Sequence, residues 1–136
     1  MRPTDPCPCG RNDARGRLLP FTQCCGPFIA GQPAPDAASL MRSRYTAYVL
    51  GDEAYLRATW LPDTCPADVS ADPSTKWLGL EVRDCKTVDA DHAEVEFVAR
   101  YRVQGRGARL HERSRFVRDA QGRWLYVDGT FPDAVP

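Results

Sequence analysis

The chain has 136 residues, with 18 basic and 18 acidic side chains and therefore no formal net charge. A chain of this length buries roughly two-thirds of its extended surface on folding, so one domain can form a core without disulfides. The hydrophobic content of 43% excludes a wholly disordered chain, and zero net charge argues against a general polyanion binder.

The sequence indicates neither a membrane span nor a secretory signal. Its longest uncharged stretch, residues 18–35, contains four prolines, which a membrane-spanning helix does not tolerate in such number. The first residues lack the apolar run that a signal peptide requires. We therefore expect a protein of the reducing cytoplasm that makes no membrane contact.

Six cysteines are the feature that this composition leaves unexplained. Four of them form two close pairs near the N-terminus, Cys7 with Cys9 and Cys24 with Cys25, and a glycine follows each pair. Two short chelating turns of this kind suit tetrahedral zinc, which then has four thiolate ligands and no open coordination position. The spacing predicts one structural Zn²⁺ per chain.

Two alternatives remain open for these four thiols. Adjacent cysteines rarely bridge to each other without strain, so a disulfide would have to join one pair to the other. Four unpaired thiols are the second alternative. Cys65 and Cys85 lack a close partner in the sequence, and each is predicted to be a buried or half-buried side chain rather than a nucleophile.

Two helices are predicted after a stiff linker at residues 31–35. Asp36 can cap the first helix, whose apolar residues recur along one face as far as Gly51. Asp52 can cap a second helix, which ends before Pro62.

Beyond Lys76 the hydrophobic period changes from that of a helix to that of a strand. Apolar residues alternate with polar ones in four segments, which are separated by turns at residues 88–92, 104–107 and 119–122. The segments predict a four-stranded antiparallel meander. Helices followed by an antiparallel sheet are typical of the α+β class.

Charges are distributed unevenly over the predicted sheet. Six acidic residues fall between positions 81 and 96, and seven arginines fall between positions 100 and 118. If the middle hairpin turns at residues 105–106, Glu96 lies opposite Arg115, and cross-strand ion pairs explain the pattern. The alternative is an RNA-binding or phosphate-binding face, for which the candidates are Arg100, Arg102, Arg109 and Arg113.

The same register turns two polar residues of the third strand toward the helices. It places Glu112 opposite Ala99 and Ser114 opposite Phe97. A buried carboxylate must be paired or protonated, and Arg42 and Arg44 on the first helix are the expected partners. Arg44 is the better placed of the two, beside Tyr45.

The sequence does not decide which face of the last strand points toward the helices. A slip of one residue decides whether Trp124, Tyr126 and Asp128 face the helices, or Leu125 and Val127 do. If the first set faces inward, Asp128 becomes a second carboxylate of the interior.

Two sets of motifs resemble known families. The run Cys7-Pro-Cys-Gly, with Phe21-Thr-Gln-Cys-Cys-Gly after it, is similar to the SEC-C zinc motif, although residues 11–20 look like an insertion. Further strings resemble the YchJ family of small bacterial proteins; they are residues 40–48, 59–60, 77–80, 97–100, 112–116 and 124–130.

This resemblance covers nearly the whole chain and implies both a fold and a metal site. YchJ-like proteins join a SEC-C zinc knuckle to a nuclear transport factor 2-like (NTF2-like, cystatin-like) domain, a cone in which a curved antiparallel sheet packs on N-terminal helices. It implies a knuckle at residues 1–30, with the four N-terminal cysteines as zinc ligands, and a cone at residues 36–133. The biochemical role of the family is unassigned.

Three hypotheses for the function follow. The leading one is a cytoplasmic zinc protein whose knuckle is structural and which binds another protein or a small ligand. The second is an enzyme with Glu112 or Asp128 as general base in the cone, as in some related folds, where the other candidates are Arg44, Tyr45 and Ser114. We prefer a structural Glu–Arg pair, because fold does not imply function.

The third hypothesis is binding of RNA or phosphate by the arginine-rich strand face, which we expect less because no stacking motif accompanies it. The enzyme hypothesis also requires an open pocket. A cone plugged by Trp60, Trp77 and Trp124 would argue against it.

Overall fold

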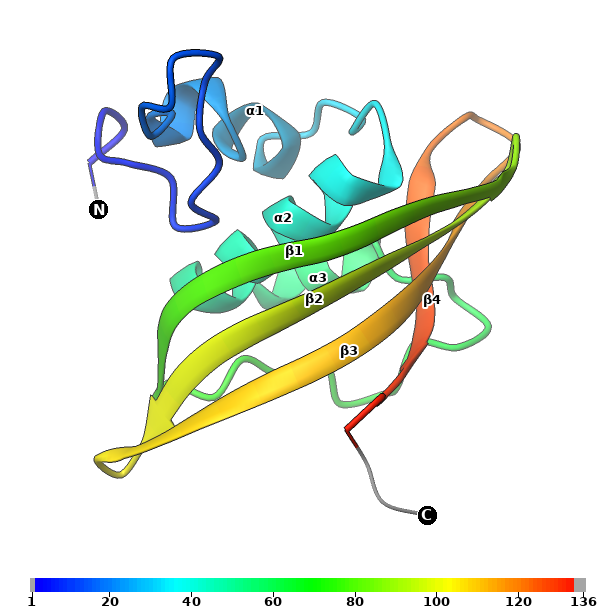
Figure 1. Cartoon of the computed structure of the whole chain (residues 1–136). Helices are drawn as coiled ribbons and strands as arrows, with labels where there is room; N and C mark the ends of the chain where they lie inside the picture. The colour runs from blue at the N-terminus through cyan, green and yellow to red at the C-terminus, as the bar shows by residue number, and fades with distance from the viewer. Residues whose placement is uncertain (1, 134–136) are drawn as a thin grey trace.

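The computed structural model describes residues 2–133 and shows short helices packed on one face of a curved four-stranded sheet (Figure 1). The order of the elements along the chain is η1 (Phe21–Gln23), α1 (Gly26–Ile29), α2 (Ala37–Leu50), α3 (Glu53–Ala58), β1 (Thr75–Asp89), β2 (His92–Val103), β3 (Arg106–Arg118) and β4 (Trp124–Thr130). This is the α+β arrangement that the sequence predicts. Met1, the first residue of the predicted knuckle, lies outside the described residues.

Local capping sets the bounds of the two main helices as predicted. The Asp36 carboxylate accepts a hydrogen bond from the Ser39 amide at 2.7 Å and so caps α2. Gly51 ends α2 in the left-handed conformation, with φ of 72°, which costs glycine little. Asp52 then caps α3 by accepting a hydrogen bond from the Tyr55 amide at 3.0 Å.

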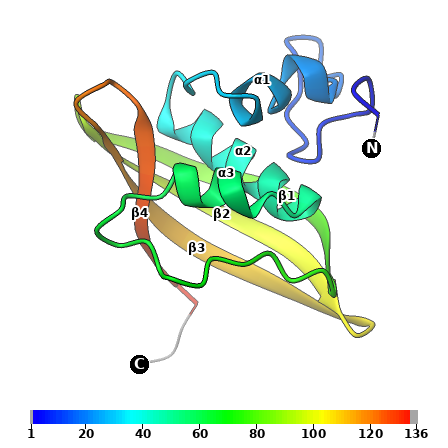
Figure 2. The same ribbon diagram turned by 180° about the vertical axis from the view of Figure 1, so that it is seen from behind.

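Helix α2 lies between the N-terminal segment and the sheet, as the view from behind shows (Figure 2). It packs against α1 on one side and against β1, β2 and β4 on the other. Most of its side chains are therefore buried, polar ones included. The described chain contains no helix that is both long and apolar enough to cross a membrane.

The four strands pair in sequence order and antiparallel, which confirms the predicted meander. The register of the middle hairpin differs from the prediction by two residues. Val103 pairs with Arg106, so the turn consists of Gln104 and Gly105, both with positive φ. Glu96 therefore lies opposite Arg113, and Glu112 lies opposite Phe97. A shift by two residues leaves every side chain on its predicted face.

An irregularity in the pairing of β3 with β4 decides which side chains of the last strand face inward. Phe116 pairs with Tyr126, whereas the preceding residue, Arg115, pairs with Asp128. Val127 is therefore the extra residue of a β-bulge. Tyr126 reaches the interior, but Asp128 lies outside and binds Arg115, so Asp128, one of the candidates for the cavity, does not lie there.

One continuous hydrophobic core joins the N-terminal cysteines to the sheet. It includes all four cysteines of the two pairs, Leu40 and Met41 of α2, and strand residues such as Phe97 and Phe116. The predicted division into residues 1–30 and 36–133 stays a prediction. We call residues 2–30 the knuckle and residues 36–133 the cone.

Candidate functional site

The knuckle gathers the four N-terminal cysteines into one buried cluster. Their sulfur atoms all lie within 4.8 Å of one another, and Cys9 Sγ is 3.5 Å from Cys24 Sγ. Backbone hydrogen bonds fix the first pair, since the Cys7 amide donates to Leu19 O at 2.9 Å and the Gly10 amide donates back to Cys7 O at 3.0 Å.

The second pair sits between η1 and α1. The Cys24 amide donates a hydrogen bond to Phe21 O at 3.1 Å, and α1 begins immediately after Cys25. A Cβ atom at Gly26 would lie 2.8 Å from Phe21 O, so a glycine is needed for this close approach.

This cluster fits a tetrahedral zinc ion. Four thiolates at about 2.3 Å from Zn²⁺ are roughly 3.8 Å apart, a separation that four sulfurs within 4.8 Å can adopt with small shifts. The Cys24 thiol shifts the pKa values of two neighbours in opposite directions through hydrogen bonds. It lowers the pKa of Cys9 to about 7 and raises the pKa of Cys25. Four adjacent thiols cannot all ionise without a cation. The donor set therefore suits Zn²⁺ held by all four sulfurs.

Helix α2 supplies contacts that hold the knuckle on the cone. Cys7 Sγ lies 3.7 Å from Thr46 Oγ1, and Arg11 Nη1 donates a hydrogen bond to Ser39 Oγ at 3.1 Å. Arg42 Nη1 donates to Cys9 O at 3.1 Å. Arg42 is therefore a neighbour of the cysteine cluster, and the prediction that it could pair with Glu112 is wrong.

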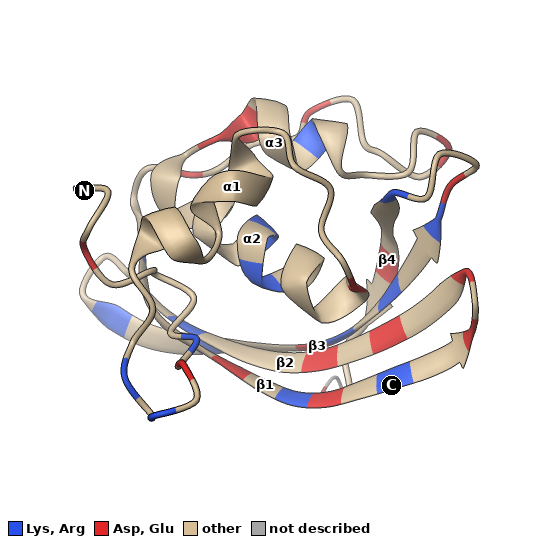
Figure 3. Ribbon diagram, turned by 90° about the horizontal axis from the view of Figure 1, so that it is seen from above, with Lys and Arg blue, Asp and Glu red and all other residues tan. Residues whose placement is uncertain are grey.

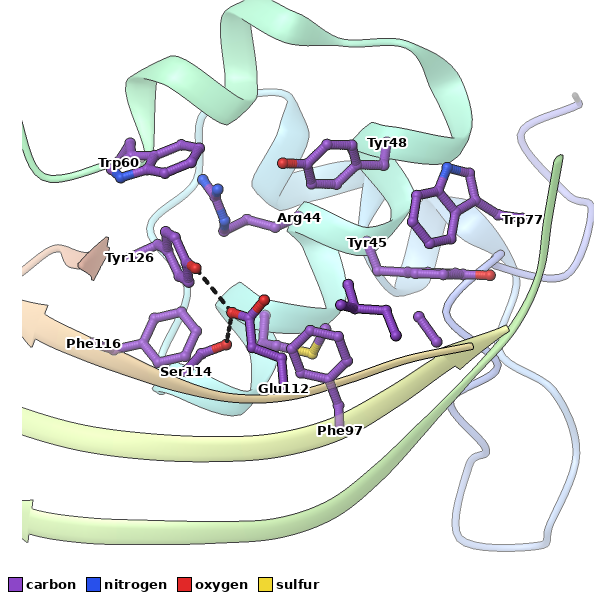
Figure 4. Close-up of a pocket in the computed structure, with 13 residues that line it drawn as sticks. Arg44, Tyr45, Tyr48, Trp60, Trp77, Phe97, Glu112, Ser114, Phe116 and Tyr126 are labelled. Carbon is purple, nitrogen blue, oxygen red and sulfur yellow. Dashed lines mark hydrogen bonds between the residues drawn. The ribbon is translucent and has the colours of Figure 1, made fainter. Parts of the chain in front are cut away.

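The opposite side of α2 lines a cavity of about 240 Å³ between the helices and the sheet (Figure 4). Aromatic side chains form most of its wall. The lining residues are Met41, Arg44, Tyr45, Tyr48, Trp60, Trp77, Phe97, Ala99, Leu110, Glu112, Ser114, Phe116 and Tyr126. Trp60 and Trp77 stand in the wall and leave the interior open, and Trp124 lies elsewhere, so the tryptophans do not plug the cone.

Glu112 lies on the floor of this cavity with 8% of its surface exposed. One carboxylate oxygen, Oε2, accepts hydrogen bonds from Ser114 Oγ at 2.6 Å and from Tyr126 Oη at 2.8 Å. A Cβ atom at Gly129 of β4 would overlap the carboxylate. The side chain is therefore held by three neighbouring positions on two strands.

Arg44 reaches the same cavity from α2 and is 5% exposed. Its Nη1 donates to Leu56 O at 2.8 Å and to Thr59 Oγ1 at 2.7 Å. The guanidinium carbon lies 5.0 Å from the ring centre of Trp60 and 4.6 Å from that of Tyr126. Burial lowers the pKa of Arg44. The predicted Glu112–Arg44 ion pair is not formed within 4.0 Å among the described residues.

Of the predicted cavity residues, the fold brings Arg44, Tyr45, Glu112 and Ser114 together. Tyr45 packs edge-on against Trp77 with ring centres 5.7 Å apart, and burial raises its pKa to about 12. Tyr126 donates a hydrogen bond directly to Glu112, but the sequence does not decide whether it faces inward, because a slip of one residue in the last strand would turn it outward.

Charged residues recur along the four strands (Figure 3), and several of them form ion pairs across the sheet. Arg113 binds Asp84 at 3.0 Å, Glu94 at 2.6 Å and Glu96 at 3.2 Å. Of the other arginines considered for RNA, Arg109 binds Asp133 and Arg100 lies 3.9 Å from Glu81. The acidic and basic stretches of the sequence therefore meet as cross-strand ion pairs, as predicted, although Arg113 and not Arg115 pairs with Glu96.

The two remaining cysteines lie apart from the knuckle. Cys65 is half-buried, with Arg57 Nη1 at 4.0 Å from its sulfur. Cys85 is exposed on β1, so the prediction that it would be buried or half-buried is wrong. Its partner across the sheet is Val95, and desolvation raises its pKa.

Comparison with known proteins identifies the family. Residues 36–129 match the family described as YchJ, middle NTF2-like domain. The chain belongs to the YchJ-like family. It is 57% identical to a UPF0225 protein of Polaromonas naphthalenivorans, over 93% of this chain and 97% of the relative. A UPF0225 protein of Ralstonia nicotianae is 59% identical, over 93% of this chain and 92% of the relative.

Two solved structures share this YchJ-like architecture. A SEC-C motif containing protein from Psychrobacter arcticus superposes with a TM-score of 0.77 at 30% identity, covering 98% of this chain and 86% of that one. A SEC-C motif containing protein from Rhodopseudomonas palustris superposes with a TM-score of 0.79 at 34% sequence identity, and the match covers 95% of this chain and 100% of that one. The expected NTF2-like α+β fold is confirmed, and the cysteine cluster occupies the N-terminal segment that precedes the YchJ-like domain.

Proposed function

We propose that this YchJ-like chain is a small-ligand-binding protein of the cytoplasm whose fold is supported by one structural zinc ion. The observation that carries the proposal is the position of α2, which contacts the cysteine cluster on one side and lines the cavity on the other. Zinc held by four thiolates has no open position for a substrate, so its role there is to stabilise the fold.

The state of the cysteines supports both zinc and a reducing compartment. All six cysteines are free, and four of them converge in one buried site. Free thiols are typical of cytosolic proteins, where thiolate clusters bind metals more often than they form disulfides.

Binding is favoured over catalysis because the cavity contains a single carboxylate. Glu112 is the one acidic residue among its lining residues, and Asp128 lies on the opposite face of the sheet. An acid pair of the kind that hydrolases and isomerases use has no second member here. Enclosure by aromatic walls with a few fixed polar groups is typical of small-molecule sites.

Metal analysis of matched variants tests the zinc site. We expect one zinc ion per chain in the natural protein and in Cys65→Ser with Cys85→Ser, and none in Cys24→Ser with Cys25→Ser. Should the latter variant fail to fold, the visible absorption of the cobalt-substituted natural protein still reports the ligands, because tetrahedral thiolate Co²⁺ has intense bands. Zinc retained by Cys24→Ser with Cys25→Ser, or weak octahedral cobalt bands, would contradict the assignment.

A further inference from the structure

The cavity holds two buried charged groups that do not close on each other. Arg44 and Glu112 are 5% and 8% exposed, and no ion pair within 4.0 Å joins them among residues 2–133. Buried opposite charges ordinarily pair directly, because each would otherwise lose its hydration without compensation. Here each is held by neighbouring groups instead, and the cavity lies beside both (Figure 4).

Each of these groups also keeps polar atoms free. Within the described chain, Glu112 accepts its hydrogen bonds at Oε2, and Arg44 donates through Nη1. Glu112 Oε1 and the Nε and Nη2 atoms of Arg44 have no hydrogen-bond partner among the described residues. None of the three is fully buried, because Trp60 Nε1 is the one fully buried side-chain N or O atom in that part of the chain without a partner. All three atoms therefore keep some exposed surface on side chains that line the cavity, and Figure 4 shows the second Glu112 oxygen directed into it.

The charges restrict what can bind between them. A cationic ligand would lie near the Arg44 guanidinium, and an anionic ligand would lie near the Glu112 carboxylate. In a low-dielectric cavity either contact is unfavourable. A neutral ligand that offers an N–H donor to Glu112 and an acceptor to Arg44 satisfies both groups.

The walls restrict the shape. Tyr45, Tyr48 and Trp77 stand on one side, with Phe97 and Phe116 on the sheet, and aromatic walls favour a flat ring that stacks or packs edge-on. The cavity of about 240 Å³ exceeds the engineered cavity of about 150 Å³ that accepts benzene, and so has room for a bicyclic ring.

We propose that the cone cavity binds a neutral, planar heterocycle whose edge carries an N–H donor beside a carbonyl acceptor, as in a lactam. The N–H donates to Glu112 Oε1, and the carbonyl accepts from the free nitrogens of Arg44. This inference rests on the proposed function of the cone as a small-ligand site and adds the chemistry of the ligand.

Four bicyclic probes of nearly the same shape test this chemistry on the zinc-loaded full chain. They are 2-quinolinone, which has both donor and acceptor; N-methyl-2-quinolinone, which lacks the donor; quinoline, which has an acceptor only; and naphthalene, which has neither. Affinities come from two-dimensional ¹H–¹⁵N NMR titrations. The indole signals of Trp60 and Trp77 report the cavity, and that of Trp124 serves as a control outside it.

We expect 2-quinolinone to bind at least tenfold more tightly than the other three probes, and to shift the signals of the cavity tryptophans alone. Equal affinity of all four probes would overturn the inference and leave a general small-ligand site. If none of the probes shifts Trp60 or Trp77, both the inference and the proposed small-ligand function fail.

A matched pair of variants locates the donor contact. In Glu112→Gln the side-chain carbonyl takes the place of Oε2, because Ser114 and Tyr126 both donate there, and the amide N–H₂ then faces the cavity. The variant should lose at least tenfold in affinity for 2-quinolinone and gain affinity for quinoline. Asp128→Asn, the same change on the outer face, should leave both affinities unchanged. An unchanged preference in Glu112→Gln would overturn the assigned contact.

Discussion

The position of Glu112 depends on a residue without a side chain. Gly129 pairs with Ser114 across the sheet, and the carboxylate of Glu112 occupies the space that a Cβ atom at Gly129 would take. Ser114 and Tyr126 then donate to the same carboxylate oxygen, so its desolvation is partly compensated by two hydrogen bonds. The orientation of the cavity carboxylate is therefore determined by the backbone of β4 as much as by its hydrogen-bond donors.

Gly129→Ala should displace this carboxylate and destabilise the fold. The added methyl group meets Glu112 itself, and such overpacking typically costs about 1–3 kcal/mol of unfolding free energy. Gly79→Ala is the matched control, because a Cβ atom at this strand position of β1 meets nothing within 4 Å. Urea unfolding of both variants measures the difference. Equal stabilities would show that Glu112 can move away without cost, and that its observed position is not constrained.

At the scale of elements, the sequence predicted the helices and strands well, but it predicted the register between the strands less well. Capping at Asp36, Gly51 and Asp52 is local, so the helix bounds could be predicted from a few neighbouring residues. The two-residue turn between β2 and β3 could consist of residues 104–105 or of residues 105–106, and both choices keep the same faces. The predicted ion pairs therefore fell on the right face with the wrong partners.

The outward position of Asp128, one of the cavity candidates, has a different cause. A single extra residue in β4 reverses the alternation after Tyr126, and no glycine or proline marks that bulge in the sequence. Tyr126 and Asp128 could therefore not be assigned to different faces from the sequence. Simple alternation places Tyr126 and Asp128 on one face, whereas the bulge separates them.

Helix α2 is the element that connects the two candidate sites, and Arg42 tests its connection to the knuckle. Zinc with four thiolates carries a formal charge of about −2, and Arg42 brings a positive charge and a hydrogen bond to Cys9 O. Arg42→Ala should weaken zinc affinity roughly tenfold, which is the smallest loss that typically follows the removal of a residue supporting a metal ligand. The measurement is zinc transfer to a chromophoric chelator.

Arg15→Ala is the control for charge alone. Arg15 is exposed on the same knuckle, and within the described residues its side chain forms no ion pair. It should retain zinc like the natural protein. If both variants lose zinc equally, the contribution of Arg42 is long-range charge rather than the contact with Cys9.

At the scale of the whole molecule, the zero net charge conceals an ordered distribution. Acidic and basic residues pair across the outer face of the sheet, whereas the knuckle would carry a local negative charge once zinc is bound. Between these surfaces, one hydrophobic core runs from the four cysteines to Phe116. Because the knuckle contributes to that core, its metal site should stabilise the cone as well as itself.

Removal of zinc should therefore destabilise the entire chain in one step. All three tryptophans lie in the cone, so their fluorescence reports the cone, and the absorption of Co²⁺ bound to the thiolates reports the knuckle. Thermal unfolding of the cobalt-loaded protein should give coincident transitions by the two signals. Chelation should lower the Tm by at least about 10 °C, since a loss of about 3 kcal/mol shifts a chain of this size by that much. Two separate transitions would instead establish residues 1–30 and 36–133 as independently folding units.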